Sequence, residues 1–265
     1  MTEQSQQSNA TSSREQFGAH AEKYAASTVH RFGPSLPMLL RLADPQPHER
    51  ALDVATGTGN TAFAVAGFAQ HVTGLDVSPG MLAQARARAE REGVDNVSFQ
   101  DGSAEHLPFP GAGFDLVTSR HAPHHFRDLG AFLREARRVL KPGGRLVVAD
   151  QITPEGKQQA EMQTWVEVWQ QTRDPSHFRQ RTGAEWRSLA AEAGFTWAAE
   201  QTVPYRLDFD WWTKQSGCSP ETAQRLRQHA RQASPEVRRA LGLEFASDGQ
   251  VAAHHEPMLV VRLER

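Results

Sequence analysis

The chain has 265 residues, with 38% hydrophobic and 23% charged side chains, which is an ordinary balance for a globular protein. A formal net charge of −2 favours neither a nucleic acid nor a membrane surface as a partner. The single cysteine, Cys218, excludes an internal disulfide and a cysteine-based zinc site. A single cysteine fits a reducing cytosol, so we expect a cytoplasmic protein. No apolar run has the length of a bilayer-spanning helix, so we expect no membrane span.

The N-terminal part of the chain is polar at first and then has a helical pattern. Residues 1–13 are rich in Gln, Ser, Thr and Asn and are predicted to form a disordered tail. Residues 14–27 form a predicted helix with Phe17 and Tyr24 on one side. A second helix is predicted over 36–43, before a run of prolines that ends it.

Strand and helix patterns then alternate up to residue 149. Such alternation is typical of βαβ units, so we predict a Rossmann-like, doubly wound and mostly parallel α/β sheet. The predicted strands cover 50–54, 71–76, 97–100, 114–119 and 145–149, the predicted helices cover 61–69, 79–92 and 129–140, and a tight turn is predicted at 141–144.

The pattern of apolar and polar residues changes after Asp150, where helical patterns dominate. Helices are predicted over 158–171 and 182–193, a strand over 195–203, and an Arg-rich helical stretch over 208–243. The apolar run 257–263 is suited to close the sheet as an antiparallel C-terminal strand. The expected sheet therefore has about seven strands, with helical additions before it and after its fifth strand.

A glycine loop follows the first predicted strand. Asp53 lies in that strand, Gly57 and Gly59 follow it, and Asp76 ends the next strand, roughly 20 residues beyond the loop. Glycines allow a sharp turn and a close approach of a ligand to the main chain. The spacing places a carboxylate beside a ribose bound over the loop, and so predicts an adenosine-containing cofactor.

Two cofactors compete for this loop. Residues 57–62 match the G-x-G-x-x-A pattern of dinucleotide-binding sites, which makes an NAD-dependent oxidoreductase one interpretation. However, Asp53 stands four positions before Gly57, where it adds negative charge close to any phosphate. A carboxylate suits a cofactor that carries an ammonium group and no phosphate, as S-adenosylmethionine does.

Residues 50–150 resemble the class I S-adenosylmethionine-dependent methyltransferases, type-11 group, which is related to the ubiquinone and menaquinone C-methyltransferases. The matching segments are LDVATGTG (52–59), VTGLDVSPGMLAQAR (72–86), GSAEHLPFP (102–110), FDLVTSRHAPHHF (114–126) and LKPGGRLVVAD (140–150). The resemblance implies one methyltransferase domain over 14–265, with its core at 48–150 and substrate-side helical additions at 14–44, 151–194 and 208–243.

The resemblance also implies roles for the residues of the glycine loop. Gly57 and Gly59 would pass under the methionine portion and the ribose of the cofactor. Asp53 would organise the loop near the ammonium group, and Asp76 would accept hydrogen bonds from both ribose hydroxyls. Ala55 stands where the fuller family pattern has its first glycine.

Further cofactor contacts are implied at the ends of the later strands. Val77 would flank the adenine, and Ser103 and Ala104 would meet its edge, the latter through its backbone N–H. Ser119 and Arg120 would approach the methionine tail. Ser103 stands where many relatives have Asp.

Histidines follow the fourth predicted strand and are candidates for a general base. Ligands bind at the carboxyl ends of strands in open α/β sheets, and histidine titrates near neutrality. The candidates are His121, His124 and His125, with His124 as the first choice for a catalytic base and His121 as the second. One or two of the three are also compatible with packing or capping. We predict no metal, since sulfonium chemistry needs none and adjacent histidines chelate poorly from one loop.

The segment RDPSHFR (173–179) is similar to a branch of bacterial members of this family. His177 in this segment is predicted either to close over the substrate or to have a structural role, with Arg173 and Asp174 paired. Trp165, Trp169 and Phe178 are candidates for the walls of an apolar or planar acceptor pocket. At least one of the two tryptophans is also expected to serve core packing.

The predicted activity is methyl transfer from S-adenosylmethionine to a small organic acceptor. The Arg-rich stretch is more typical of a solvated helix face than of a nucleic-acid surface, and residues 119–122 lack the motif of base-directed amino-methyltransferases. A cofactor-binding protein without turnover remains the alternative, as does, less favoured, the NAD-dependent oxidoreductase. A homodimer is compatible with the sequence.

Overall fold

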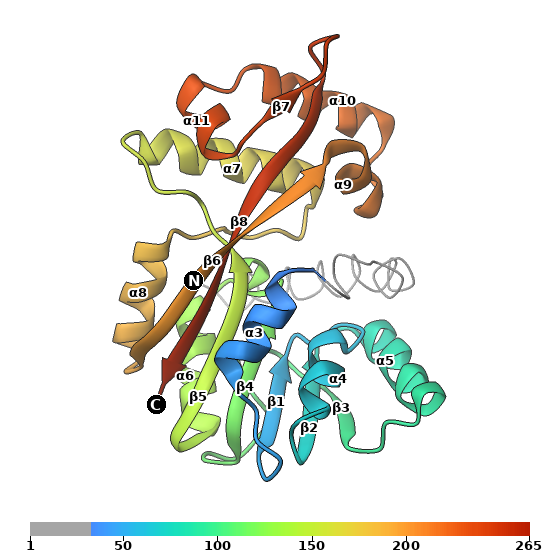
Figure 1. Cartoon of the computed structure of the whole chain (residues 1–265), viewed down its shortest axis with the longest axis vertical. Helices are drawn as coiled ribbons and strands as arrows, with labels where there is room; N and C mark the ends of the chain where they lie inside the picture. The colour runs from blue at the N-terminus through green and yellow to red at the C-terminus, as the bar shows by residue number, and fades with distance from the viewer. Residues whose placement is uncertain (1–32) are drawn as a thin grey trace.

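The computed structural model describes residues 33–265. The predicted tail over 1–13 and the predicted helix over 14–27 lie outside these residues. Figure 1 shows a large twisted sheet with helices on its faces, and a second group of helices beyond the upper ends of its last two long strands.

The sheet confirms the predicted α/β architecture. It contains eight strands, seven of them in the order β3-β2-β1-β4-β5-β8-β6, while the short β7 pairs with β8. The first five strands pair in parallel, and β8 is antiparallel to both β5 and β6. The strands are β1 (Arg50–Val54), β2 (His71–Asp76), β3 (Val97–Asp101), β4 (Phe114–Arg120), β5 (Leu140–Gln151), β6 (Thr196–Asp208), β7 (Glu244–Phe245) and β8 (Val251–Glu264).

Helices cover the sheet and fill the region beyond it. Ser78 caps α5, as the sequence predicts, by accepting a hydrogen bond from the amide of Met81. The helices of the described residues are α3 (Ser35–Ala43), α4 (Asn60–Ala66), α5 (Pro79–Glu92), α6 (Leu129–Val139), α7 (Gln159–Arg173), α8 (Gly183–Glu192), α9 (Phe209–Gln215), α10 (Pro220–Arg231) and α11 (Pro235–Ala240), with a 3-10 turn η1 (Pro123–His125).

Each face of the sheet has its own hydrophobic core. Adjacent strand residues point to opposite faces, so Leu116 belongs to one core and Val117 to the other. The first core contains Leu39 of α3, and the second contains Phe132 of α6 and Trp186 of α8. These buried side chains explain why the central strands β1 and β4 are buried along most of their length, whereas β3 at one edge is largely exposed.

A cap lobe stands beyond the carboxyl ends of the parallel strands (Figure 1). We define it as α7, α9, α10, α11, β7 and the extended parts of β6 and β8. β8 pairs with β5 only from Met258 to Glu264, but it pairs with β6 from Ala253 to Glu264. The long antiparallel pair β6–β8 therefore connects the sheet to the cap lobe.

Three sequence predictions needed correction. The tight turn predicted at 141–144 is instead part of β5, and the pairing of β5 with β4 shifts register there. Gly143 in this stretch has a φ of 77°. Glycine tolerates the left-handed conformation that such an irregularity requires. The strand predicted over 195–203 continues to Asp208, and the C-terminal strand begins at Val251, because the two strands pair beyond the core. The helical stretch 208–243 is divided into α9, α10 and α11.

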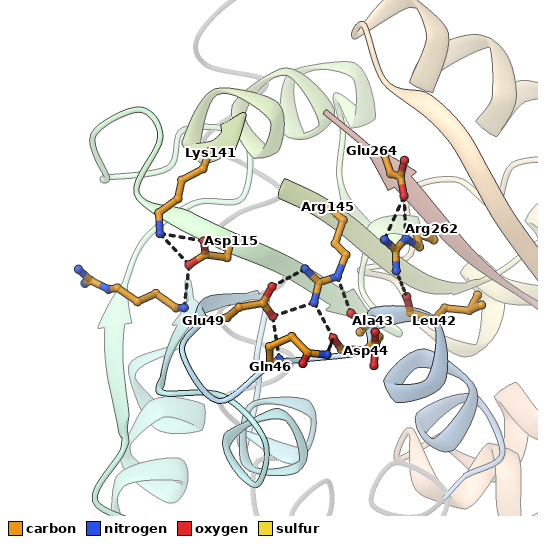
Figure 2. Close-up of polar contacts among 11 residues, drawn as sticks. Leu42, Ala43, Asp44, Gln46, Glu49, Asp115, Lys141, Arg145, Arg262 and Glu264 are labelled. Carbon is orange, nitrogen blue, oxygen red and sulfur yellow. Dashed lines mark hydrogen bonds and ion pairs between the residues drawn. The ribbon is translucent and has the colours of Figure 1, made fainter. Parts of the chain in front are cut away.

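Arginine side chains fix α3 at the amino-terminal edge of the sheet (Figure 2). The Arg145 guanidinium donates to the carbonyl oxygens of Ala43 and Asp44 and, at 2.7 and 2.8 Å, to the carboxylate of Glu49. Arg262 of β8 donates to the carbonyl oxygen of Leu42 at 3.2 Å. Cationic donors satisfy the last carbonyl groups of a helix, so α3 is held firmly and its other end, Ser35, reaches the opposite edge of the sheet.

Candidate functional site

The predicted site residues gather at the carboxyl edge of the parallel strands. Asp76 lies beside Asp101 in the β2–β3 register, and Arg120 lies beside Ala149 in the β4–β5 register. The loop after β1 ends at the same edge. Sequence spacing alone therefore placed these groups correctly along the sheet.

The loop between β1 and α4 has a left-handed backbone at three alternate positions. The φ angles are 56° at Ala55, 55° at Gly57 and 84° at Gly59. A Cβ atom built on Gly57 would meet no atom within 4 Å, whereas one built on Gly59 would lie 2.7 Å from the Phe63 ring. Gly59 is thus required for packing, and the space beside Gly57 leaves the backbone open to a ligand.

Asp53 in β1 stabilises this loop through hydrogen bonds of its buried carboxylate. It is 1% exposed, and it accepts hydrogen bonds from the hydroxyls of Thr56 at 2.6 Å and Thr118 at 2.7 Å. Burial raises the pKa of Asp53 to about 6, even though both hydroxyls favour its charged form. Its contacts join β1, the loop and β4, which agrees with the predicted role of organising the loop.

Asp76 connects the loop to the next helix. Its two carboxylate oxygens accept from the amide of Gly57 at 2.8 Å and from the amide of Ser78 at 2.9 Å. Burial raises the pKa of Asp76 despite these bonds. Because each carboxylate oxygen can accept more than one hydrogen bond, the side chain keeps acceptor capacity for a pair of hydroxyl groups.

The remaining predicted cofactor residues lie around the ends of β2, β3 and β4. Ser103 accepts a hydrogen bond from the amide of Glu105 at 3.2 Å and so serves its own turn, beside the buried Ala104. Val77 directly follows β2. The Ser119 hydroxyl is buried and has no hydrogen-bond partner within residues 33–265.

Three elements, α3, α4 and β6, converge on Arg120 and His121 at the end of β4. Arg120 donates from Nε to the hydroxyl of Thr61 at 3.1 Å and from Nη1 to that of Ser35 at 3.4 Å. Ser35 Oγ lies 2.7 Å from the Tyr205 hydroxyl and 3.4 Å from His121 Nε2. His121 has a φ of 55° and its ring is perpendicular to that of Tyr205. We refer to these five residues as the β4-end cluster.

Sequence reasoning missed three members of this cluster. Ser35, Thr61 and Tyr205 come from α3, α4 and β6, and no local pattern distinguishes them from ordinary polar residues. The fold alone brings them to Arg120. Only Arg120 and His121 could be predicted as site residues from the sequence, because they follow the fourth predicted strand.

His124 is buried and anchored at its side chain. It is 9% exposed, and its Nδ1 lies 2.7 Å from the carboxyl group of Asp150, which is 2% exposed. Burial is the largest cause of both pKa shifts, lowering the pKa of His124 to about 3 and raising that of Asp150 to about 7. The pair is therefore favoured in its uncharged form, with one proton on the carboxyl group.

The segment RDPSHFR contacts residues 121–125 after β4, which we call the histidine loop. The amides of Phe178 and Arg179 donate to the carbonyl oxygen of His124 at 3.1 and 2.9 Å. The His177 ring stacks on the His124 ring at a centroid distance of 5.3 Å. His125 Nδ1 lies 3.0 Å from the carbonyl oxygen of Ser176, so backbone, ring and side-chain contacts all restrain the loop.

The predicted pairing of Arg173 with Asp174 does not form. Asp174 instead accepts from the amide of Ser176 at 2.9 Å and from its hydroxyl at 2.6 Å, while Arg173 donates to the carbonyl oxygen of Trp212 at 3.2 Å. Asp174 thus closes a local turn, which is a common use of Asp before a Pro. Trp165 and Trp169 are stacked at 5.1 Å within the cap lobe and are buried.

Residues 33–265 contain no group of three or more His, Cys, Asp or Glu side chains placed to hold a metal ion. None of the helices in this part of the chain is long and apolar enough to span a bilayer.

Comparisons with known proteins identify the family. The profile described as "Methyltransferase domain" matches residues 45–194. The uncharacterized methyltransferase YcgJ of Bacillus subtilis is 32% identical over 234 residues, or 88% of this chain and 91% of that protein. Its crystal structure gives a TM-score of 0.84 at 31% identity, over 87% of this chain and 97% of that one.

Other relatives agree. The crystal structure of a putative methyltransferase from Bacillus halodurans gives a TM-score of 0.83 at 30% identity, over 88% of this chain and 99% of that one. The demethylmenaquinone methyltransferase of Thermus thermophilus is 42% identical over 124 residues, which is 45% of this chain and 56% of that protein. The chain belongs to the methyltransferase domain family and is an S-adenosylmethionine-dependent methyltransferase.

Proposed function

We propose that the chain transfers the sulfonium methyl group of S-adenosylmethionine to a small organic acceptor at the carboxyl edge of the sheet. The observation that carries this proposal is the glycine loop braced by two buried carboxylates, Asp53 and Asp76. The bound cofactor supplies an electrophilic methyl group and a good leaving group. The chain itself has to align the acceptor, exclude water and accept a proton where the acceptor carries one.

The cofactor contacts follow from the geometry of the loop. Gly57 leaves backbone space for the ribose and methionine portion, and Asp76 keeps acceptor capacity for the ribose hydroxyls. Val77, Ser103 and Ala104 are proposed around the adenine. Ala55 and Gly59 shape the loop, and Ser119 and Arg120 are proposed near the methionine tail; the unpartnered Ser119 hydroxyl supports this assignment.

Of the two histidines predicted as a base, His121 is better supported by its surroundings. It is half-buried beside Arg120 and Tyr205 in the β4-end cluster. His124 has one ring nitrogen committed to Asp150, and its lowered pKa makes it a weak proton acceptor at neutral pH. We therefore propose His121 as the base and His124 as the residue that positions the loop carrying it.

The acceptor is proposed to be a small molecule with an apolar or planar part. The support is the aromatic and aliphatic character of the cap lobe next to the β4-end cluster, where Met162, Val166 and Tyr205 are buried in one hydrophobic core. A quinone does not follow from the demethylmenaquinone methyltransferase of Thermus thermophilus, because that match covers only 45% of this chain.

A binding experiment tests the proposal directly. Calorimetric titration should detect S-adenosylmethionine binding, and Asp76→Ala should weaken it about tenfold or more, since a carboxylate that accepts two hydroxyl bonds is lost. Asp95→Ala, an exposed acid between α5 and β3, is the matched control and should bind normally. Binding of NADH without binding of S-adenosylmethionine would overturn the proposal.

Turnover separates the enzyme from a binding protein without activity. Formation of S-adenosylhomocysteine with a panel of planar acceptors should occur with the wild type and fall with His121→Ala. Tight cofactor binding with no product from any acceptor would favour the binding protein instead. The expected cytoplasmic location and homodimer stay predictions, which fractionation of source cells and light scattering would check.

A further inference from the structure

A polar hollow lies on elements that the methyl-donor site does not use. It has a volume of about 300 Å³ and lies between the start of α6, the residues that precede α8, and α8 itself. Arg127, Arg179 and Arg181 line it together with the first turn of α6. We call it the arginine hollow. Figure 1 shows α6 and α8 side by side beneath the cap lobe.

Arg181 is the unusual member of this group. It is 9% exposed, and within residues 33–265 its guanidinium makes one long contact, from Nη1 to the carbonyl oxygen of Arg179 at 3.5 Å. No carboxylate of residues 33–265 lies within 4.0 Å of it, and burial lowers its pKa. A buried guanidinium without a directly paired carboxylate is costly, so an anion placed in the hollow would offset that cost.

The carboxylates around the hollow are already engaged by other groups. Glu185 forms an ion pair with Arg179 and accepts from the amide of Thr182 in the capping box of α8. Glu192 accepts from the hydroxyl of Ser188 at 2.9 Å. Glu185 favours the charged form of Arg181 from a distance, but neither carboxylate forms an ion pair with it.

The third carboxylate, Asp128, serves the helix that opens onto the hollow. It caps α6 by accepting from the amide of Ala131 at 2.8 Å, and it lies 3.7 Å from Arg134. Leu129 and Gly130 line the hollow, and their amides have no acceptor within the described part of the chain. Free amides at the positive end of a helix of 11 residues favour an anion.

We propose that the arginine hollow binds the phosphate or carboxylate group of a small anionic metabolite, with Arg181 and the first turn of α6 as its principal contacts. Arg179, which also lines the hollow, donates its backbone amide to the carbonyl oxygen of His124. A bound anion would thus join the segment before α8 to the loop before α6, and restrain the histidine loop between them.

Titration of the isotope-labelled full chain with inorganic phosphate tests the proposal by NMR. At constant ionic strength set with chloride, phosphate should shift the amide signals of Leu129 and Gly130 in a saturable way. Arg181→Met should weaken phosphate binding about tenfold or more, as expected for the loss of a charge-assisted bond. Acetate and citrate, titrated in parallel, distinguish a carboxylate ligand from a phosphate ligand.

Two variants that each introduce one negative charge on α8 keep the test valid if the Arg181 variant misfolds. Ser188 is exposed and lines the hollow, whereas Ala191 is exposed on the same helix and does not. Ser188→Asp should abolish anion binding, and Ala191→Asp should retain it, while S-adenosylmethionine affinity stays unchanged in both. Equal anion binding by the two variants, or shifts that chloride reproduces, would overturn the proposal.

Discussion

The His124–Asp150 pair illustrates how burial alters the chemistry of single residues. In the unfolded chain near pH 5, the histidine carries the proton and the carboxyl group is ionised, because their ordinary pKa values are 6.5 and 3.8. In the folded chain the histidine pKa is about 3 and the carboxyl pKa about 7. Both states bind one proton, so the pair contributes little pH dependence to stability between about pH 4 and 6.5.

In wild type the opposite pKa shifts of His124 and Asp150 cancel, so the Asp150→Asn variant should have a stability that depends more strongly on pH. The lowered pKa of His124 then acts alone, so the unfolded state binds more protons and stability falls as the pH falls from 6.5 to 4. The expected slope relative to the wild type is about 1 kcal/mol per pH unit. Urea unfolding at pH 4.5, 5.5 and 6.5 measures it, with Asp95→Asn as the exposed control. Wild-type and Asp150→Asn stabilities that change in parallel would contradict the interpretation.

Single residues differ in how well the sequence predicts their roles. Asp53, Gly57, Gly59 and Asp76 could be found because the chemistry of the loop requires them at fixed spacing along adjacent strands. Tyr205 could not, because it meets Ser35 across 170 positions of sequence and depends on the path of β6. Local spacing carries information about strand ends, but not about which distant side chain will reach them.

At the scale of elements, α3 depends on the ion pair between Glu49 and Arg145. Both side chains are buried, at 7% exposure each, and the arginine also satisfies the end of α3. Removing one partner leaves an uncompensated buried charge, which typically costs about 3–5 kcal/mol. Glu49→Gln should therefore lower the free energy of unfolding by about 3 kcal/mol in urea titration.

An exposed ion pair provides the control for this prediction. Arg206 and Glu244 are linked by a salt bridge between β6 and β7, and both side chains are about half exposed. Arg206→Met should leave the unfolding midpoint within experimental error, because water already solvates such a pair. Equal effects of Glu49→Gln and Arg206→Met would show that the buried pair does not anchor α3.

Element boundaries were predicted well where local signals were strong. Ser and Pro mark the beginning of α5, and the same Ser-Pro signal recurs at Ser219 and Ser234, where α10 and α11 begin. The Arg-rich stretch was nevertheless interpreted as one helical run. The extra length of β6 and β8 had no local signal of comparable strength, since it depends on the two strands pairing with each other outside the core.

At the scale of the whole molecule, β8 is part of both the core sheet and the cap lobe. Its C-terminal half pairs with β5 in the core sheet, and its N-terminal half pairs with β6 in the cap lobe. The cap-lobe core includes the stacked rings of Trp169 and Trp212, which are each 1% exposed. Because one continuous strand serves both parts, neither can lose its packing without disturbing the pairing of the other.

The sheet and the cap lobe should therefore unfold together. Tryptophan fluorescence, dominated by the cap lobe, and far-UV circular dichroism should give the same midpoint in urea. Trp169→Leu removes buried ring contacts and should lower both midpoints equally, by about 2–4 kcal/mol in free energy of unfolding. Val168→Ala, an exposed neighbour on the same helix at 45% exposure, should change neither. If Trp169→Leu shifted the fluorescence transition but left the dichroism transition in place, the cap lobe would be an independent folding unit, and its two long strands would not couple it to the site.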